Sequence, residues 1–130
     1  MSEDRQQQLA AAQNALQGGR FDEGLRLAGD LLAQDEGDTE ARYIAAVAAR
    51  YLERYDLAQT HLAALHEASP EYGRAWQEEG HLALASGDSA AALAAFTRAV
   101  RFNPALEASW REQARLLTAA GRGGEAQAAR

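Results

Sequence analysis

The side chains that could carry chemistry in this 130-residue sequence are 13 basic residues, 19 acidic residues and three histidines, with no cysteine. His61 and His66 are five residues apart, so on a helix they point to different faces and do not form a metal site. No group of serine, histidine and aspartate, and no pair of carboxylates, stands apart from ordinary helix-surface charge. The sequence therefore predicts no catalytic residue, no metal site and no cofactor, and we expect that this chain by itself is not an enzyme.

Recognition by arginine is the chemistry that remains. All the basic residues are arginines, and a guanidinium group binds a carboxylate through paired hydrogen bonds. Residues 1–72 carry 13 acidic residues and 6 arginines, a net charge of −7, whereas residues 73–130 carry 6 and 7, a net charge of +1. Because the whole chain is acidic at −6, we expect no nucleic-acid partner.

The same composition bears on location. The acidic start, Met1 to Asp4, is followed by no apolar run, and no stretch of 18 apolar residues occurs. We therefore expect a cytoplasmic protein with no membrane partner, and we interpret the absence of lysine as a GC-rich bacterial coding bias.

A repeat of 34 residues positions these side chains. It is seen in two tryptophans, two prolines, two glycines and three alanines: Trp76 and Trp110, Pro70 and Pro104, Gly87 and Gly121, and Ala58, Ala92 and Ala126. Helices and strands repeat every few residues, so a period this long indicates a copied supersecondary unit. About a quarter of the chain is alanine, the strongest helix former, and no strand-like alternation occurs.

Each unit is predicted to hold two helices. The first ends at a short turn such as Gly19-Arg20-Phe21, because glycine tolerates the left-handed conformation of a helix exit. Pro70 and Pro104 mark the start of the next unit. The expected helices lie at 4–17, 21–34, 38–52, 55–68, 72–86, 89–102, 106–120 and 122–129.

The pattern in the third unit resembles the tetratricopeptide repeat. It places Trp76, Gly80, Ala92, Phe96 and Pro104 at the family's offsets within residues 73–106. The other units are 5–38, 39–72 and a truncated 107–130, with Arg42 where the second unit would have tryptophan. The resemblance implies an all-α fold, a right-handed α-solenoid of antiparallel helix pairs with about 3.5 repeats, forming one domain over 1–130. It also implies that Trp76 and Trp110 pack between units.

Tetratricopeptide arrays usually bind a peptide in a concave groove, and the resemblance assigns its positions here. The candidate groove residues are Tyr43, Arg50, Tyr51, Arg74, Gln77, His81, Arg111 and Arg115. They predict an acidic or carboxylate-bearing protein or peptide as partner. The alternative, that these are solvated arginines on a helix face, stays open.

The chaperone-type carboxylate clamp of some members is not reproduced. Leu9, Gln13 and Ile44 stand at positions where that clamp needs other residue types. We therefore expect no binding to the large cytosolic chaperones.

A narrower resemblance concerns the stretches Tyr72 to His81 and Asn103 to Arg111. They look like the repeat region that precedes the enzyme domain of bacterial tetratricopeptide-repeat sulfotransferases. This implies the amino-terminal segment of a larger enzyme, although Gly121-Arg122-Gly123-Gly124 lacks the ending of a phosphate-binding loop. The expected function is an interaction scaffold. The alternative is a structural module that self-associates through its repeat ends, where Leu116 and Leu117 are poorly covered.

Overall fold

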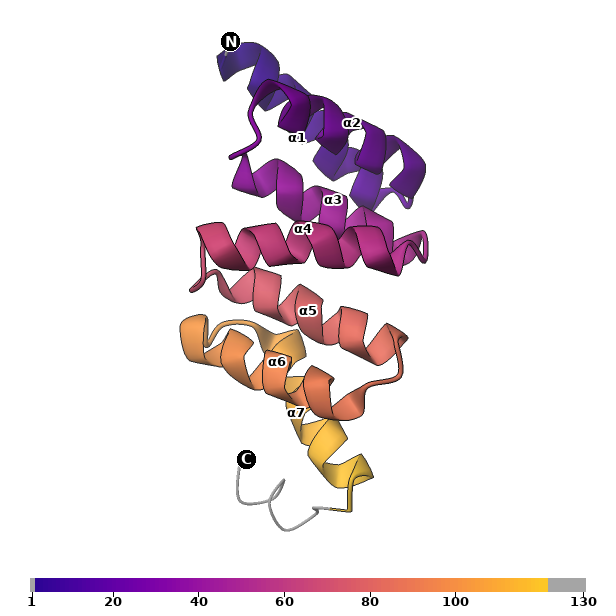
Figure 1. Ribbon diagram of the computed structural model, residues 1–130, viewed down its shortest axis with the longest axis vertical. Helices are drawn as coiled ribbons and strands as arrows, with labels where there is room; N and C mark the ends of the chain where they lie inside the picture. Colours follow the sequence, from indigo (N-terminus) through magenta and orange to yellow (C-terminus); the bar gives the residue numbers. More distant parts are fainter. Residues whose placement is uncertain (1, 122–130) are drawn as a thin grey trace. The chain divides into compact units, whose positions relative to one another are not determined.

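The computed structural model describes residues 2–121, which fold into helices without any strand in that range. In chain order the helices are α1 (Ser2–Gln17), α2 (Phe21–Gln34), α3 (Thr39–Tyr51), α4 (Tyr55–Ala68), α5 (Gly73–Ala85), α6 (Ser89–Phe102) and α7 (Glu107–Ala119) (Figure 1). The predicted bounds of α2, α4 and α6 are confirmed to the residue, and the others differ by one or two residues. The predicted helix at 122–129 lies outside the described residues.

The contacts cluster into two compact units, one ending at Ala68 and the other beginning at Ser69. The first contains α1 to α4 and the second contains α5 to α7. Consecutive helices joined by short turns pack against each other within each unit. That the whole chain forms a single domain stays a prediction.

Small side chains build the core of the first unit. Four alanines that are at most 1% exposed form one cluster with three larger apolar residues: Ala12, Ala28, Ala41 and Ala45 with Leu9, Leu31 and Ile44. On α2 the buried residues Gly24, Ala28 and Leu31 follow helical spacing along one stripe. Alanine and glycine at these positions let the helices approach closely. The alanines also have the highest helix propensity of any residue.

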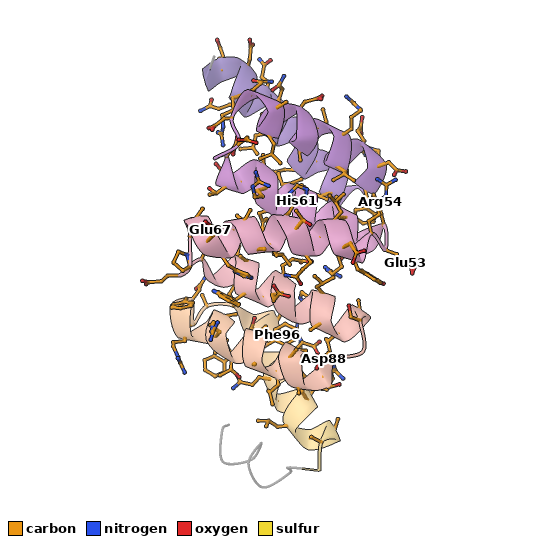
Figure 2. All side chains as sticks on the ribbon, viewed as in Figure 1. Glu53, Arg54, His61, Glu67, Asp88 and Phe96 are labelled. Atoms are coloured by element: carbon orange, nitrogen blue, oxygen red, sulfur yellow. The ribbon has the colours of Figure 1, made fainter. Side chains whose placement is uncertain are left out.

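The core of the second unit is organised around the phenyl ring of Phe96. Phe96 of α6 is fully buried beside Ala92 and Leu116 (Figure 2). A Cβ atom added at Gly80 of α5 would lie only 2.6 Å from Cε1 of Phe96. Gly80 is therefore required by the phenylalanine ring, which occupies the space that a side chain at residue 80 would need.

The turn that ends the first helix of each repeat has the same backbone throughout. Gly19, Gly87 and Gly121 have φ values of 76°, 82° and 77°, and Glu53 occupies the equivalent place with φ 61°. In three of these turns an amide donates to the carbonyl five residues earlier at 2.8 or 2.9 Å: Arg20 to Ala15, Arg54 to Ala49 and Asp88 to Ala83. The left-handed residue thus closes each helix in the same way, even where it is a glutamate.

The tryptophans correct one expectation. Trp110 is 46% exposed and Trp76 is half-buried, so the structure does not show Trp110 as a packed core residue. What repeats instead is a hydrogen bond: the indole Nε1 of Trp76 donates to the carbonyl of Pro70 at 2.8 Å, and that of Trp110 to the carbonyl of Pro104 at 2.9 Å. Each bond ties the first turn of a helix to the proline loop before it.

Arg42 takes over this role where the repeat lacks tryptophan. Its Nη2 donates to the carbonyl of Glu36 at 2.9 Å, again six residues earlier in the chain. Three repeats thus share a side-chain bond to the loop six residues earlier, made by two different residue types.

Candidate functional site

The eight candidate groove residues fall into two sets, one in each compact unit. Tyr43, Arg50 and Tyr51 belong to α3 of the first unit. The second set lies on α5 and α7: Arg74, Gln77, His81, Arg111 and Arg115. Their assignment to a binding groove stays a prediction, and the geometry of each set shows what it offers a ligand.

The first set forms a cationic aromatic surface. The ring of Tyr51 stacks on that of Phe21 with centroids 4.3 Å apart and planes 2° from parallel. The guanidinium carbon of Arg50 lies 4.4 Å from the centre of the Tyr51 ring. Because Tyr51 is still 53% exposed, the stack presents flat apolar area, a hydroxyl and a positive charge together.

Gln77 and His81 are engaged in internal packing. Gln77 Oε1 accepts a hydrogen bond from the fully buried hydroxyl of Ser109 at 2.7 Å, which links α5 to α7. The His81 ring meets Phe96 at 74° with centroids 5.2 Å apart. Both side chains therefore hold helices of the second unit together, and this role was not predicted from the sequence.

The arginines of the second unit differ in their freedom. Arg115 is paired with Glu112 one turn earlier on α7, with Nε 2.7 Å from the Oε1 atom of the carboxylate. Arg74 and Arg111 are exposed and make no hydrogen bond or ion pair with another residue of the 2–121 range. Among the candidate groove residues of α5 and α7, these two guanidinium groups are open to an incoming carboxylate.

A partly buried ion pair in the first unit was not predicted from the sequence. The Asp38 side chain is 3% exposed, and Arg5 donates to both of its oxygens at 2.9 and 3.0 Å. Asp38 also caps α3 by accepting from the amide of Ala41 at 3.2 Å. The bonds from Arg5 hold the pKa of Asp38 below its ordinary value. An aspartate just before a helix start predicts the cap, but no local signal predicts a partner 33 residues away.

His61 has a partner that defines its protonation. Arg42 Nη1 lies 3.1 Å from Nδ1 of His61 (labelled in Figure 2). Because a guanidinium only donates, Nδ1 must accept, so the ring is neutral with its proton on Nε2. Burial, and secondarily the charge of Arg42, lower the pKa of His61. His61 is thus a structural acceptor, and the described residues hold no cluster of three metal-ligating side chains.

A cavity of about 470 Å³ opens between α6 and α7 in the second unit. Its lining is small or apolar: Ser89, Ala90, Leu93, Ala94, Leu116 and Ala120. The sequence pattern did not predict it, because it arises from small residues at places where other repeats carry larger ones. Among residues 2–121, no helix has the length and hydrophobicity needed to span a membrane.

Comparisons with known proteins identify the fold. No protein-family model and no curated protein matches the chain. Among solved structures, a thermophilic tetratricopeptide-repeat protein from Thermus thermophilus is 22% identical with a TM-score of 0.82, over 95% of this chain and 69% of that one. The protein MamA is 17% identical with a TM-score of 0.80, over 92% and 70%.

A third similar structure carries a ligand. The first tetratricopeptide-repeat domain of Spaghetti, bound to the HSP90 peptide SRMEEVD, is 15% identical with a TM-score of 0.81, over 93% of this chain and 96% of that one. At these identities the likeness concerns the fold. The predicted fold class, an all-α solenoid of the tetratricopeptide-repeat type, is confirmed.

Proposed function

We propose that this chain is a protein-interaction scaffold that binds an acidic or carboxylate-bearing segment through exposed arginines. The observation that carries the proposal is the freedom of Arg74 and Arg111, which are exposed without a partner in the described range. Uncompensated guanidinium groups on an acidic protein favour a ligand with carboxylates, which they also orient. The similar Spaghetti domain supports this role, since the HSP90 peptide bound to it, SRMEEVD, contains three acidic residues.

The first unit supports the same proposal through its aromatic surface. Tyr51, with Arg50 against its ring, offers an apolar anchor beside a cation. A ligand with an apolar residue near a carboxylate would use both properties. Tyr43 completes this candidate set on α3. Because the chaperone clamp residues are absent, we propose a partner other than the large cytosolic chaperones.

A peptide library tests the proposal. Acidic peptides and matched copies with Asp→Asn and Glu→Gln changes would be titrated by fluorescence anisotropy at low and physiological salt. We expect the acidic peptides to bind more tightly than the amide copies. Their affinity should fall as added salt shortens the screening length to about 8 Å. Arg74→Glu with Arg111→Glu should remove this preference.

The control is Arg54→Glu with Arg101→Glu, which changes the net charge equally at two other exposed positions. The proposal is wrong if both double variants, shown by circular dichroism to be folded, behave alike. It is also wrong if the amide copies bind as well as the acids.

Self-association is a second candidate function, favoured by one observation. The ring of Trp110 is 46% exposed although its indole nitrogen is already bonded to Pro104. A large exposed ring favours a contact with another helix, such as one from a second copy. Light scattering over a concentration series should then show a dimer that Trp110→Ala abolishes, and a monomer at every concentration contradicts this candidate.

The proposal also concerns the larger protein to which this chain would belong. The resemblance of Tyr72 to His81 and Asn103 to Arg111 to sulfotransferase repeat regions supports a role as the amino-terminal segment of a larger cytoplasmic bacterial enzyme. The described helices supply no catalytic grouping of their own, so such an activity would belong to another domain. Sequencing the gene beyond the codon for Arg130 tests this directly, and a downstream region without an α/β domain contradicts it.

A further inference from the structure

The first helices of consecutive repeats meet within each compact unit, α1 with α3 in the first and α5 with α7 in the second. These two contacts lie two repeats, or 68 residues, apart, so that Gln77 corresponds to Leu9 and Ser109 corresponds to Ala41. Leu9 and Ala41 are both buried and belong to one apolar cluster. The second unit therefore carries a polar pair at a place where the first unit has an apolar pair.

Stability alone does not require the polar pair. The hydroxyl of Ser109 is fully buried, and its hydrogen bond to Gln77 replaces the water that it has lost. Replacing both members of such a pair by apolar groups of similar shape is close to neutral for stability. Leucine and alanine indeed occupy the corresponding positions in the first unit. The bond between Gln77 and Ser109 thus favours a role beyond holding α5 against α7.

This bond fixes the direction of the Gln77 amide. Its length of 2.7 Å is typical of a hydroxyl donor and shorter than the bond of about 2.9 Å that an amide N–H usually makes, so the serine donates and Oε1 accepts. Nε2 of the same planar amide makes no hydrogen bond with any residue from 2 to 121, and it is not one of the buried polar atoms that lack a partner. Nε2 therefore reaches solvent and offers two N–H donors.

Two arginines stand near this donor in the two helices. Arg74 lies three residues before Gln77 on α5, and Arg111 lies two residues after Ser109 on α7. Residues three apart on a helix are neighbours on its surface. Both guanidinium groups are exposed and form no hydrogen bond or ion pair within the described part of the chain. A neutral donor of fixed direction thus lies on the same pair of helices as two open cations.

We propose that Gln77 donates through Nε2 to an oxygen of the bound peptide, and that Ser109 is the positioning residue that turns this amide outward. This inference rests on the proposed interaction function and adds a specific contact to that surface. The oxygen belongs to a main-chain carbonyl or to a side-chain carboxylate, since both accept from an amide N–H. A donor that is already held in place loses little conformational freedom on binding, so it contributes more to affinity than a freely rotating one.

Two small probes distinguish these sources of the oxygen. N-acetyl-aspartate N-methylamide carries a carboxylate and main-chain carbonyls, whereas N-acetyl-asparagine N-methylamide carries amide carbonyls and no charge. Each is titrated into the full chain while the two Nε2 hydrogens of Gln77 are followed by NMR. We expect saturable shifts of these resonances, with a dissociation constant on the order of 1 mM for the aspartate probe. Shifts with both probes assign the contact to a carbonyl, and shifts with the aspartate probe alone assign it to the carboxylate.

Variants of the pair separate positioning from packing, with affinities read from the signals of the probe itself. Gln77→Leu with Ser109→Ala restores the residue types of the first unit, so it should keep the wild-type circular dichroism but bind about fivefold more weakly, because one hydrogen bond is lost. Ser109→Ala alone keeps the donor but releases the amide, and it should weaken binding about threefold, since the side chain must now be ordered on binding. Ser109→Thr retains the hydroxyl and should bind as the wild type does.

The matched control is Gln7→Leu with Ser86→Ala, which makes the same two changes at exposed positions on other surfaces and should leave the affinity unchanged. Three results overturn the proposal. One is the absence of saturable shifts at the Gln77 amide with either probe. Another is wild-type affinity in the folded pair variant, which would show that the pair only holds the helices together. The third is equal weakening by the control.

The proposed function is tested separately by the arginines. Arg74→Glu with Arg111→Glu should remove the preference for the aspartate probe over the asparagine probe. If the wild type shows that preference but the pair variant binds as tightly as the wild type, the contact of Gln77 is wrong and the proposed function stands. The reverse result, weaker binding by the pair variant without any preference for the aspartate probe, retains the contact and contradicts the acidic partner.

Discussion

The junction between α2 and α3 occurs at the same place in the repeat as the junction between α6 and α7, but the surfaces of the two junctions differ. In the first, Phe21 and Tyr51 stack and Arg50 adds a cation. In the second, the positions 68 residues later hold Ser89 and Ala119, and a cavity is lined by Ser89, Leu93 and Leu116 together with small residues. Both junctions follow the same backbone pattern. A left-handed glycine, Gly19 before α2 or Gly87 before α6, ends the preceding helix.

The comparison separates two kinds of sequence position. The left-handed turn residue and the side-chain bond to the preceding loop recur in successive repeats, because the backbone path depends on them. Side-chain volume at the junction surface differs between the two junctions, although buried small residues position the helices in both. Binding surfaces can therefore change from repeat to repeat while the fold stays the same.

The largest expected effect concerns the core of the second unit. Phe96→Ala should lower the free energy of unfolding by about 4 kcal/mol, because it empties a fully buried aromatic site. Leu62→Ala, the equivalent position in the first unit and also fully buried, should cost roughly 3 kcal/mol. Urea denaturation followed by circular dichroism measures both.

Residue-resolved hydrogen exchange then shows whether the two units respond separately. Phe96→Ala should lower protection in α5 to α7, and Leu62→Ala in α1 to α4. Equal loss of protection from α1 to α7 in both variants would show that the division into two compact units has no energetic counterpart.

The next effect compares two helix caps. Asp38 and Asp88 both accept from an amide three residues later, but only Asp38 is buried and bonded to an arginine. Asp38→Ala should cost about 2 kcal/mol, whereas Asp88→Ala should cost about 1 kcal/mol, the usual value of an exposed cap. Similar losses in urea denaturation would show that Arg5 contributes little.

The lowered pKa of Asp38 adds a pH signature to this comparison. A carboxyl whose folded pKa lies below its unfolded value of 3.8 stabilises the fold above that pH, and this contribution disappears as the pH falls through the folded pKa. The difference in stability between the wild type and Asp38→Asn should therefore be constant from pH 7 to about pH 5 and shrink at lower pH. A difference that does not change down to pH 2 contradicts the ion-pair account.

The sequence predicted the helices well and the side-chain contacts poorly, for a physical reason. Helix bounds follow from local propensity and turn residues, and the bounds of α2, α4 and α6 were found this way. The bonds of Arg5 to Asp38 and of Arg42 to Glu36 depend on where helices meet, which no local pattern encodes. Trp110 was expected to pack between units because the resemblance to the tetratricopeptide repeat implied it, yet its ring is 46% exposed. The cavity was missed because it results from small residues at several separate positions.

A smaller effect is expected when the two junctions are exchanged. Ser89→Phe with Ala119→Tyr should raise the stability of the second unit by about 1 kcal/mol, since it adds apolar contact and a stacked ring pair. Phe21→Ser with Tyr51→Ala should lower the stability of the first unit by a similar amount. If the first exchange destabilises the protein, the α6–α7 junction cannot hold a stack and the positional comparison fails.

The smallest effect concerns the turn after α3. Glu53 has φ 61°, a conformation that strains a residue with a Cβ atom, whereas Gly19, Gly87 and Gly121 adopt it freely. Glu53→Gly should therefore raise the free energy of unfolding by roughly 0.5 kcal/mol, because relief of the strain exceeds the extra entropy that glycine gains in the unfolded chain. The reciprocal change, Gly87→Ala, should lower it by about 1 kcal/mol, because nothing around Gly87 obstructs a Cβ atom and only the backbone conformation opposes it. Paired urea titrations resolve both shifts, and a loss of stability in Glu53→Gly would show that the glutamate side chain itself stabilises this turn.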